Sequence, residues 1–164
     1  MKHVLLTLVL LLAAVSASAQ KLVSGSFSPL RSQHYVKFAI EYVSIHGMTE
    51  KDYAIYEPAW GKDKPEIVGQ FKTSMSDELE GALIFGNPDE AKYTIKAQVN
   101  TVNKDGDYNC DMVLIDQHGK EVGRMIGIKA DGGHFGSKDN LIGDGAEHTG
   151  KKFGKILKKL LKSK

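Results

Sequence analysis

The sequence predicts an α+β fold, in which an antiparallel or mixed sheet of about four to five strands is packed by two helices, the longer one C-terminal. Residues 92–130 contain three runs of alternating apolar and polar side chains, and short links rich in turn-forming residues join them, as in an antiparallel meander. Residues 65–79 and 140–161 instead repeat apolar residues every three or four positions, the spacing of a helix face. Together these patterns indicate a sheet covered by helices.

Two extended segments and a helical turn come first. Residues 22–27 form a short extended piece, and residues 36–42 alternate apolar and polar side chains as a half-buried strand does. Thr49, followed by Asp52, resembles the cap of a helical turn that Pro58 ends early.

The first long helix follows an irregular loop, which we expect around Trp60 over residues 58–65. Pro65 suits the first turn of that helix, because proline lacks a backbone N–H that this turn leaves unused. Gly81 marks its end, and residues 83–85 form a short extended piece before the meander.

Each strand of the meander presents one apolar face, but Arg124 interrupts the face of the third strand. Either this strand lies near a sheet edge or Arg124 meets a buried acid. We favour the edge, because arginine is almost never buried unpaired. The three apolar faces are Tyr93, Ile95, Ala97 and Val99; Tyr108, Cys110, Met112 and Leu114; and Val122, Ile126, Ile128 and Ala130.

The last element is one long helix from about Asn140 to Leu161. Ala146, Gly150 and Gly154 recur every four residues along its apolar side, and each glycine costs roughly 1 kcal/mol in helix propensity relative to alanine. A close packing contact must recover that loss. We expect the partner to be the sheet.

The end of this helix is cationic and amphipathic, with an apolar stripe at positions 153, 156, 157, 160 and 161. Such a stripe is typical of a helix on an anionic membrane surface. It is equally typical of a core helix whose lysines face solvent and stabilise the helix C-terminus, which we favour. The candidate contacts to an anionic surface are Lys151, Lys152, Lys155, Lys158, Lys159 and Lys162.

Charge is unevenly distributed along the chain. Residues 151–164 contain seven lysines and no acid, whereas residues 20–150 contain 14 basic and 20 acidic residues. This asymmetry fits an anionic partner, but the basic tail can also pair with its own acidic body.

Residues 1–19 are typical of a cleavable export signal. A positive start precedes a short apolar run, and Ala17-Ser18-Ala19 forms an Ala-x-Ala cleavage site. The apolar run is shorter than the roughly 20 residues that a spanning helix needs. Gln20 stands where a lipoprotein would have Cys. We therefore expect a single domain over residues 20–164 that is periplasmic or secreted and not lipid-anchored.

The motifs of the common catalytic and cofactor sites are missing from the sequence. The Gly-rich loop at residues 131–139 is not followed by the Gly-Lys-Ser/Thr of a phosphate cradle, and no Gly-x-Ser-x-Gly elbow is present. Cys110 has the pattern of a buried strand residue. We expect a protein that is not an enzyme and has no cofactor, bound metal or nucleic-acid partner. The residues that could assemble a metal site, without any known ligand spacing, are Asp131, His134, Asp139, Asp144 and His148.

Three segments resemble small exported α+β envelope domains of Gram-negative bacteria, the periplasmic auxiliary and assembly-factor proteins, many of which have unknown function. They are Asp89–Val99, the hairpin from Met112 to Glu121 with Gly119-Lys120, and Gly150-Lys151-Lys152-Phe153. The resemblance implies a non-enzymatic, partner-binding role and supplies no catalytic residue. Such proteins are often lipoproteins, which this chain, with Gln20, does not match.

Two functions follow as hypotheses. The first is a periplasmic or secreted module that binds a protein or glycan through its sheet or a sheet edge. The second is an envelope-surface protein that attaches to anionic lipid or lipopolysaccharide through its lysine-rich helix. The polar sheet face for the first consists of Thr94, Lys96, Gln98, Asn100, Asn109 and Asp111.

Overall fold

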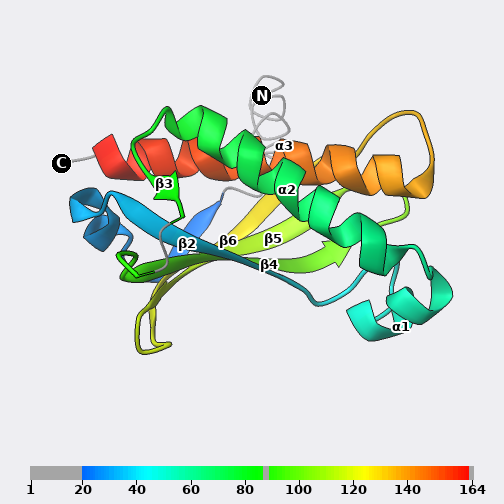
Figure 1. Ribbon diagram of the computed structural model, residues 1–164, viewed down its shortest axis with the longest axis horizontal. Coiled ribbons are helices and arrows are strands. Elements are labelled where there is room, and N and C mark those ends of the chain that lie inside the picture. The colour runs from blue at the N-terminus through cyan, green and yellow to red at the C-terminus, as the bar shows by residue number, and fades with distance from the viewer. Residues whose placement is uncertain (1–19, 87–88, 163–164) are drawn as a thin grey trace, which may run out of the picture.

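The protein is an α+β structure in which two long helices pack on one face of a six-stranded mixed sheet (Figure 1). The computed structural model describes residues 20–86 and 89–162. The predicted export signal, residues 1–19, lies outside the described residues, and cleavage after Ala19 stays a prediction. The predicted fold class is confirmed.

The strands follow the order β1-β6-β5-β4-β2-β3 across the sheet. β4, β5 and β6 form the antiparallel meander that the sequence predicts, and β1 adds to β6 antiparallel. β2 runs parallel to both β4 and β3, which makes the sheet mixed. The strands are β1 (Lys21–Gly25), β2 (Tyr35–Tyr42), β3 (Ile84–Phe85), β4 (Tyr93–Val102), β5 (Tyr108–Asp116) and β6 (Glu121–Ala130).

The helices are η1 (Ser28–Ser32), α1 (Glu50–Tyr56), α2 (Trp60–Leu79) and α3 (Lys138–Lys162). The predicted cap of α1 is confirmed, since the Thr49 hydroxyl accepts a hydrogen bond from the Asp52 amide at 3.2 Å. α2 begins at Trp60, so the loop predicted over residues 58–65 is wrong. Burial decides this start: the Trp60 ring packs edge-on against two buried tyrosines, and its indole N–H donates to Glu50 Oε1 at 3.0 Å.

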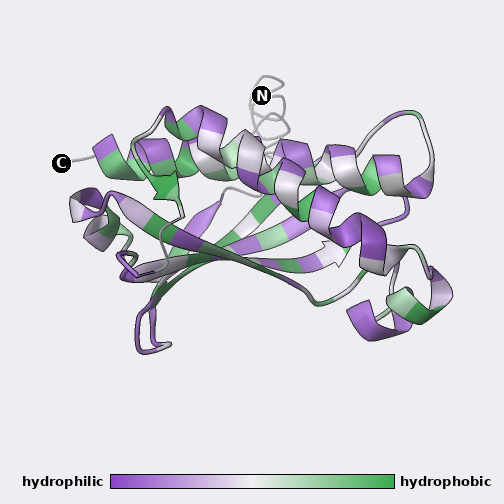
Figure 2. Ribbon diagram, viewed as in Figure 1, coloured by the Kyte–Doolittle hydropathy of each residue, from purple (hydrophilic) through white to green (hydrophobic). Residues whose placement is uncertain are grey.

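The core lies between the helices and the sheet, and Figure 2 shows apolar residues on both layers. Phe71 of α2 joins them, because its ring contacts Phe38 of β2 at 5.3 Å and Phe153 of α3 at 5.2 Å between centroids. On α3, Phe153 and Leu157 are fully buried and Ile156 is nearly so. The stripe of the C-terminal helix is therefore core.

α3 packs closely on α2, not on the sheet, along its row of small residues. A Cβ atom on Gly150 would lie 2.2 Å from the Phe71 carbonyl oxygen, and one on Gly154 would lie 2.7 Å from that of Met75. The predicted close contact is confirmed, but its predicted partner is wrong. The sequence shows which helix side is small and cannot show what faces it.

Arg124 is not at a sheet edge, because β6 lies between β1 and β5. Irregularities in the β5–β6 register place Arg124 opposite Val113, on the face away from the helices. There its guanidinium meets the largely buried Asp111. The strand lies near an edge, with only β1 beyond it, but the contact that accounts for Arg124 is the buried acid.

Candidate functional site

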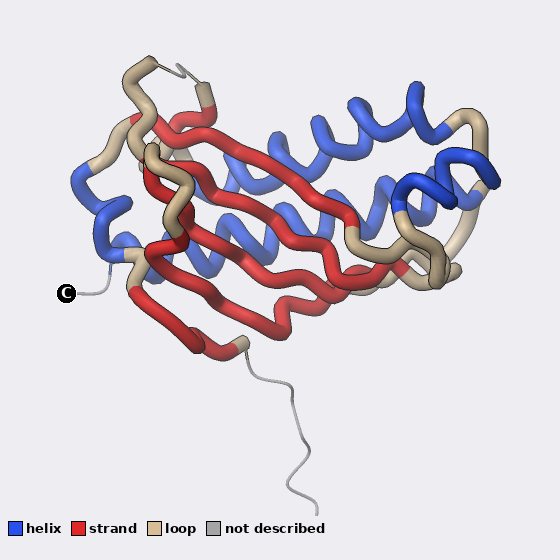
Figure 3. The backbone as a smooth tube through the Cα atoms, turned by 90° about the horizontal axis from the view of Figure 1, so that it is seen from below, coloured by secondary structure: helices blue, strands red, loops and turns tan. Residues whose placement is uncertain are grey.

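The face of the sheet that points away from the helices is the candidate site. Figure 3 looks onto this outer face, with both long helices behind the sheet. On β4 and β5 the residues alternate between the core and this face, as the sequence predicts. The outer residues of these strands include Thr94, Lys96, Gln98 and Asn100 on β4 and Asn109, Asp111, Val113 and Ile115 on β5.

Arg124 is the centre of a hydrogen-bond network on this face. One terminal guanidinium nitrogen donates to Asp111 Oδ2 at 3.2 Å and to Gln98 Oε1 at 3.4 Å. The other terminal nitrogen and Nε donate to the Glu121 carboxylate, at 2.8 Å and 3.1 Å. The guanidinium thus bridges β6, β5 and β4.

Amide side chains extend the network. Gln98 Nε2 donates to Asn100 Oδ1 at 3.1 Å, and Asn100 Nδ2 donates to Asp111 Oδ1, also at 3.1 Å. At the opposite end, the Ser24 hydroxyl of β1 donates to Glu121 Oε1 at 3.1 Å. The connected side chains therefore reach from β1 to β4, and the neighbouring Lys96–Glu41 ion pair continues the polar row to β2.

The network stabilises the charged forms of Glu121 and Arg124. The hydrogen bond from Arg124, supported by that from Ser24, lowers the pKa of Glu121, and the same contact raises the pKa of Arg124. Val113 is only 2% exposed although it lies on the outer face; its cross-strand partners are Lys96 and Arg124. The stems of these side chains therefore cover an apolar strip, while their charged heads pair with acids on the same face.

The arrangement suits binding rather than covalent chemistry. It offers a guanidinium, amides and carboxylates in fixed orientations, which recognise hydroxyl, amide and charged groups of a ligand. Cys110, the cysteine of the chain, lies on the opposite side of β5 and is fully buried, and burial raises the pKa of its thiol. It is therefore unavailable as a nucleophile in the folded protein.

Sequence reasoning found the outer residues of β4 and β5 but missed Ser24, Glu41 and Glu121. Glu121 and Arg124 are three residues apart and would face opposite sides of a regular strand. The register shift opposite Leu114 and Ile115 brings them to one face. Gly123, a glycine inside a strand, is the signal that could have indicated this bulge.

Most lysines of α3 lie in its C-terminal half, and several of them pair with the protein's own acids. Lys151 contacts Glu147 at 2.5 Å, and Lys158 contacts Glu80 at 2.6 Å. Lys155 lies 3.7 Å from Glu78, Lys152 donates to the Lys129 carbonyl, and Lys159 and Lys162 are exposed. The acidic body thus takes up part of the basic charge of the tail.

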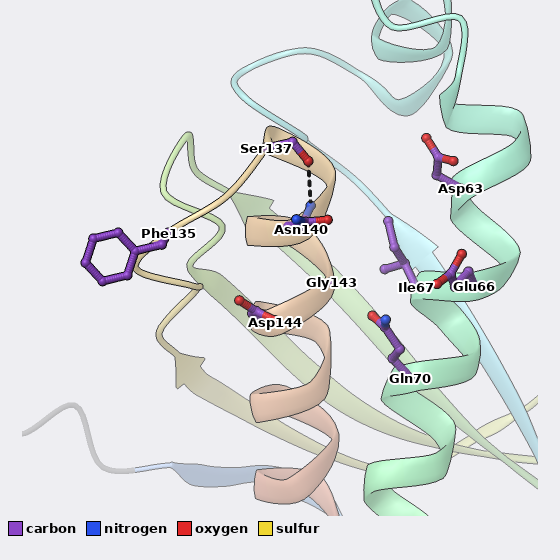
Figure 4. A pocket seen from close by; sticks show the side chains of 9 residues that line it. All are labelled: Asp63, Glu66, Ile67, Gln70, Phe135, Ser137, Asn140, Gly143 and Asp144. Atoms are coloured by element: carbon purple, nitrogen blue, oxygen red, sulfur yellow. Dashed lines mark hydrogen bonds between the residues drawn. The ribbon is translucent and has the colours of Figure 1, made fainter.

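The residues considered for a metal do not all come together at one place. Asp144 lines a cleft of about 390 Å³ between α2 and α3, together with Asp63 and Glu66, while Phe135 points away from it (Figure 4). Asp131, His134 and His148 line a different cavity. Within residues 20–86 and 89–162, excluding the side chain of Asp139, no three His, Cys, Asp or Glu residues form a group suited to a metal.

No helix in the described part of the chain is both long and apolar enough to cross a membrane.

Comparison with known proteins gives structural similarity only. No family model matches the sequence, and no curated protein matches it. Two solved structures of the PelC dodecamer from Paraburkholderia phytofirmans are similar, and each comparison covers 85% of this chain and 96% of the other. A point variant of PelC in space group C2 has 18% sequence identity and a TM-score of 0.47. The structure in space group P6 has 14% identity and a TM-score of 0.48.

Proposed function

We propose that this protein is a non-enzymatic, exported binding module, periplasmic or secreted, that binds a protein or glycan partner through the outer face of its sheet. The observation that carries the proposal is the network around Arg124, which links side chains of four strands on a face that neither long helix covers.

The fixed arrangement of these polar groups distinguishes this face from an ordinary solvent-exposed face of a sheet. An antiparallel sheet can present polar residues to water without any fixed arrangement among them. Here the side chain of Asp111 is only 12% exposed and that of Arg124 only 26%, and both are held by several hydrogen bonds. A preorganised surface loses less side-chain entropy when a partner binds.

The side chains on the outer face indicate the chemistry of the partner. Amides, carboxylates and a guanidinium bind extended polar ligands, such as a peptide backbone or the hydroxyl groups of a sugar chain. Lys96 and Arg124 stand against Glu41, Asp111 and Glu121, so the row has no strong net charge. Hydrogen bonding rather than charge attraction would therefore select the partner.

The test is to block the face without breaking the network. Thr94→Arg and Asn109→Arg add bulk on outer positions that lie outside the network, whereas Thr73→Arg adds the same bulk on the exposed side of α2. The purified chain and these variants are used in pull-downs from envelope extract and on a glycan array, at physiological salt.

We expect a specific partner whose binding falls by roughly tenfold in the double outer-face variant and stays unchanged in Thr73→Arg. Equal binding by both variants would place the partner elsewhere. The absence of any specific protein or glycan partner would contradict the function itself.

The second hypothesis is attachment to an anionic surface through α3. Its apolar stripe is not available for insertion into a membrane surface. Phe153 and Leu157 of the stripe are fully buried against the rest of the protein. What remains for such a contact is the set of lysine side chains. Their arrangement around one cavity leads to a narrower proposal.

A further inference from the structure

A cavity of about 400 Å³ lies between α3, the end of β6 and the loop that follows β6. Its volume falls within the range of small-ligand sites. The charged and titratable residues that line it are Asp131, His134, His148, Lys151, Lys152 and Lys155.

One face of α3 supplies four of these groups. His148, Lys151, Lys152 and Lys155 are spaced by three, four and seven residues, so they project from the same side of the helix. His134 comes from the loop after β6 and approaches from a second segment. The site is thus assembled by the fold, and not by the helix alone.

The lining is positively charged. Three lysines stand against one carboxylate, that of Asp131, which leaves a net charge of +2 with neutral histidines. Lys151 also forms an ion pair with Glu147, and Lys155 forms a longer one with Glu78. Lys152 donates to the Lys129 carbonyl, which leaves two of its three N–H donors for a ligand.

The walls of the cavity are held in place. His148 Nδ1–H donates to the Asp131 carbonyl at 2.8 Å, which orients the ring and leaves Nε2 for a ligand. The backbone N–H of Gly132 donates to Asp107 Oδ1 at 2.7 Å and fixes the start of the loop. When the His148 ring is protonated, Nε2 also becomes a donor.

We propose that this cavity binds a phosphate group. Ammonium groups bind phosphate as point charges, and three of them with two imidazoles around one small cavity suit a compact, multiply charged oxyanion. The phosphate can belong to a soluble phosphate compound or to a lipid headgroup, and the experiment separates these sources. This site is independent of the outer sheet face.

The first measurement is a titration of the nitrogen-15-labelled chain with inorganic phosphate at constant ionic strength, followed by NMR. We expect saturable shifts of the amides of Gly132, His134 and Lys152, with a dissociation constant on the order of 1 mM. Shifts that are absent, or that rise linearly without saturation, would overturn the proposal.

Matched variants distinguish a site from diffuse charge. Lys152→Gln removes the ammonium that has no acidic partner, and Lys151→Gln with Lys155→Gln removes two exposed charges without disturbing the core. Lys159→Gln with Lys162→Gln removes the same charge from the same helix outside the cavity. We expect roughly tenfold weaker phosphate binding for the cavity variants and no change for the control pair. Equal weakening by the control pair would overturn the proposal.

The source of the phosphate is separated by two further arms. One is a titration with glycerol 3-phosphate, and the other is sedimentation with phosphatidylglycerol vesicles, with phosphatidylcholine vesicles as reference. Vesicle binding that Lys151→Gln with Lys155→Gln abolishes, and the control pair retains, assigns the site to lipid phosphate. Binding of glycerol 3-phosphate without vesicle binding assigns it to soluble phosphate. Vesicle binding that both pairs weaken equally counts against the cavity.

Discussion

Gly150→Ala tests the close contact between α2 and α3. The added Cβ would lie 2.2 Å from the Phe71 carbonyl oxygen and 3.0 Å from its carbon. Carbon and oxygen atoms need about 3.4 Å, so the helices must separate by about 1 Å. The obstacle is backbone in the middle of a helix, which cannot rotate away as a side chain can.

The magnitude follows from two opposing effects. Alanine gains about 1 kcal/mol over glycine in helix propensity, whereas overpacking of a well-packed interior costs about 1–3 kcal/mol or more. Because separation would also loosen the contact between Phe71 and Phe153, we expect the upper end of that cost. The net loss in free energy of unfolding is then about 2 kcal/mol, or a Tm lower by roughly 4–8 °C.

Gly69→Ala is the matched control. Gly69 lies in the middle of α2, and a Cβ there meets no atom within 4 Å, so only the propensity gain applies. We expect this variant to be stabilised by up to about 1 kcal/mol. Guanidinium chloride denaturation, followed by circular dichroism, gives both values. A Gly150→Ala protein as stable as Gly69→Ala would refute the close contact.

Three further predictions concern single residues. The thiol of Cys110, buried and with a raised pKa, should resist alkylation in the native protein and react after unfolding, which mass spectrometry detects. Because the pKa of Glu121 is lowered in the folded state, its contribution to stability should be present at neutral pH. That contribution should disappear as pH falls through the folded-state pKa, so Glu121→Gln should flatten the acid side of the stability curve; an unchanged curve would contradict the Arg124 contact. Thr49→Ala should lower the free energy of unfolding by about 1 kcal/mol, because the Asp52 amide loses its cap; Thr49→Ser, which retains the hydroxyl, should recover most of it.

The meander could be predicted because its signals are local. Alternation along each strand and glycine or aspartate in each hairpin fix three strands and their order without knowledge of the remaining chain. The Asn103 side chain, for example, accepts from the Asp107 amide at 2.8 Å inside the first of these turns. Such contacts join residues only a few positions apart.

The predictions from sequence are wrong where the structure depends on residues far apart in the chain. The first turn of α2 depends on the burial of Trp60 against Tyr42 and Tyr53, which no propensity rule contains. The place of β6 inside the sheet depends on β1, whose exposed and irregular residues give a weak strand signal. Without β1, Arg124 appears to lie at an edge.

The candidate sites divide in the same way. Alternation alone predicts that Gln98, Asn100 and Asp111 share a polar face. For the cavity on α3, the sequence groups Asp131, His134 and His148 as polar residues that could form one site, but it does not indicate that the lysines of α3 join them. Only the packing of α3 beside the end of β6 brings His134 next to Lys152.

The position of β1 also determines the order in which the sheet can be completed. Lys21 lies opposite Ile126, and β1 has no other neighbour among the strands described. During synthesis from the N-terminus, the residues of β1 are therefore made first, but β1 can pair only after β6, the last strand of the meander, has been made. Closing so long a loop is entropically costly and slow. Until then β1 stays unpaired. A truncation that removes β6 would therefore leave β1 with exposed backbone N–H and C=O groups, which promote aggregation, rather than a smaller stable domain.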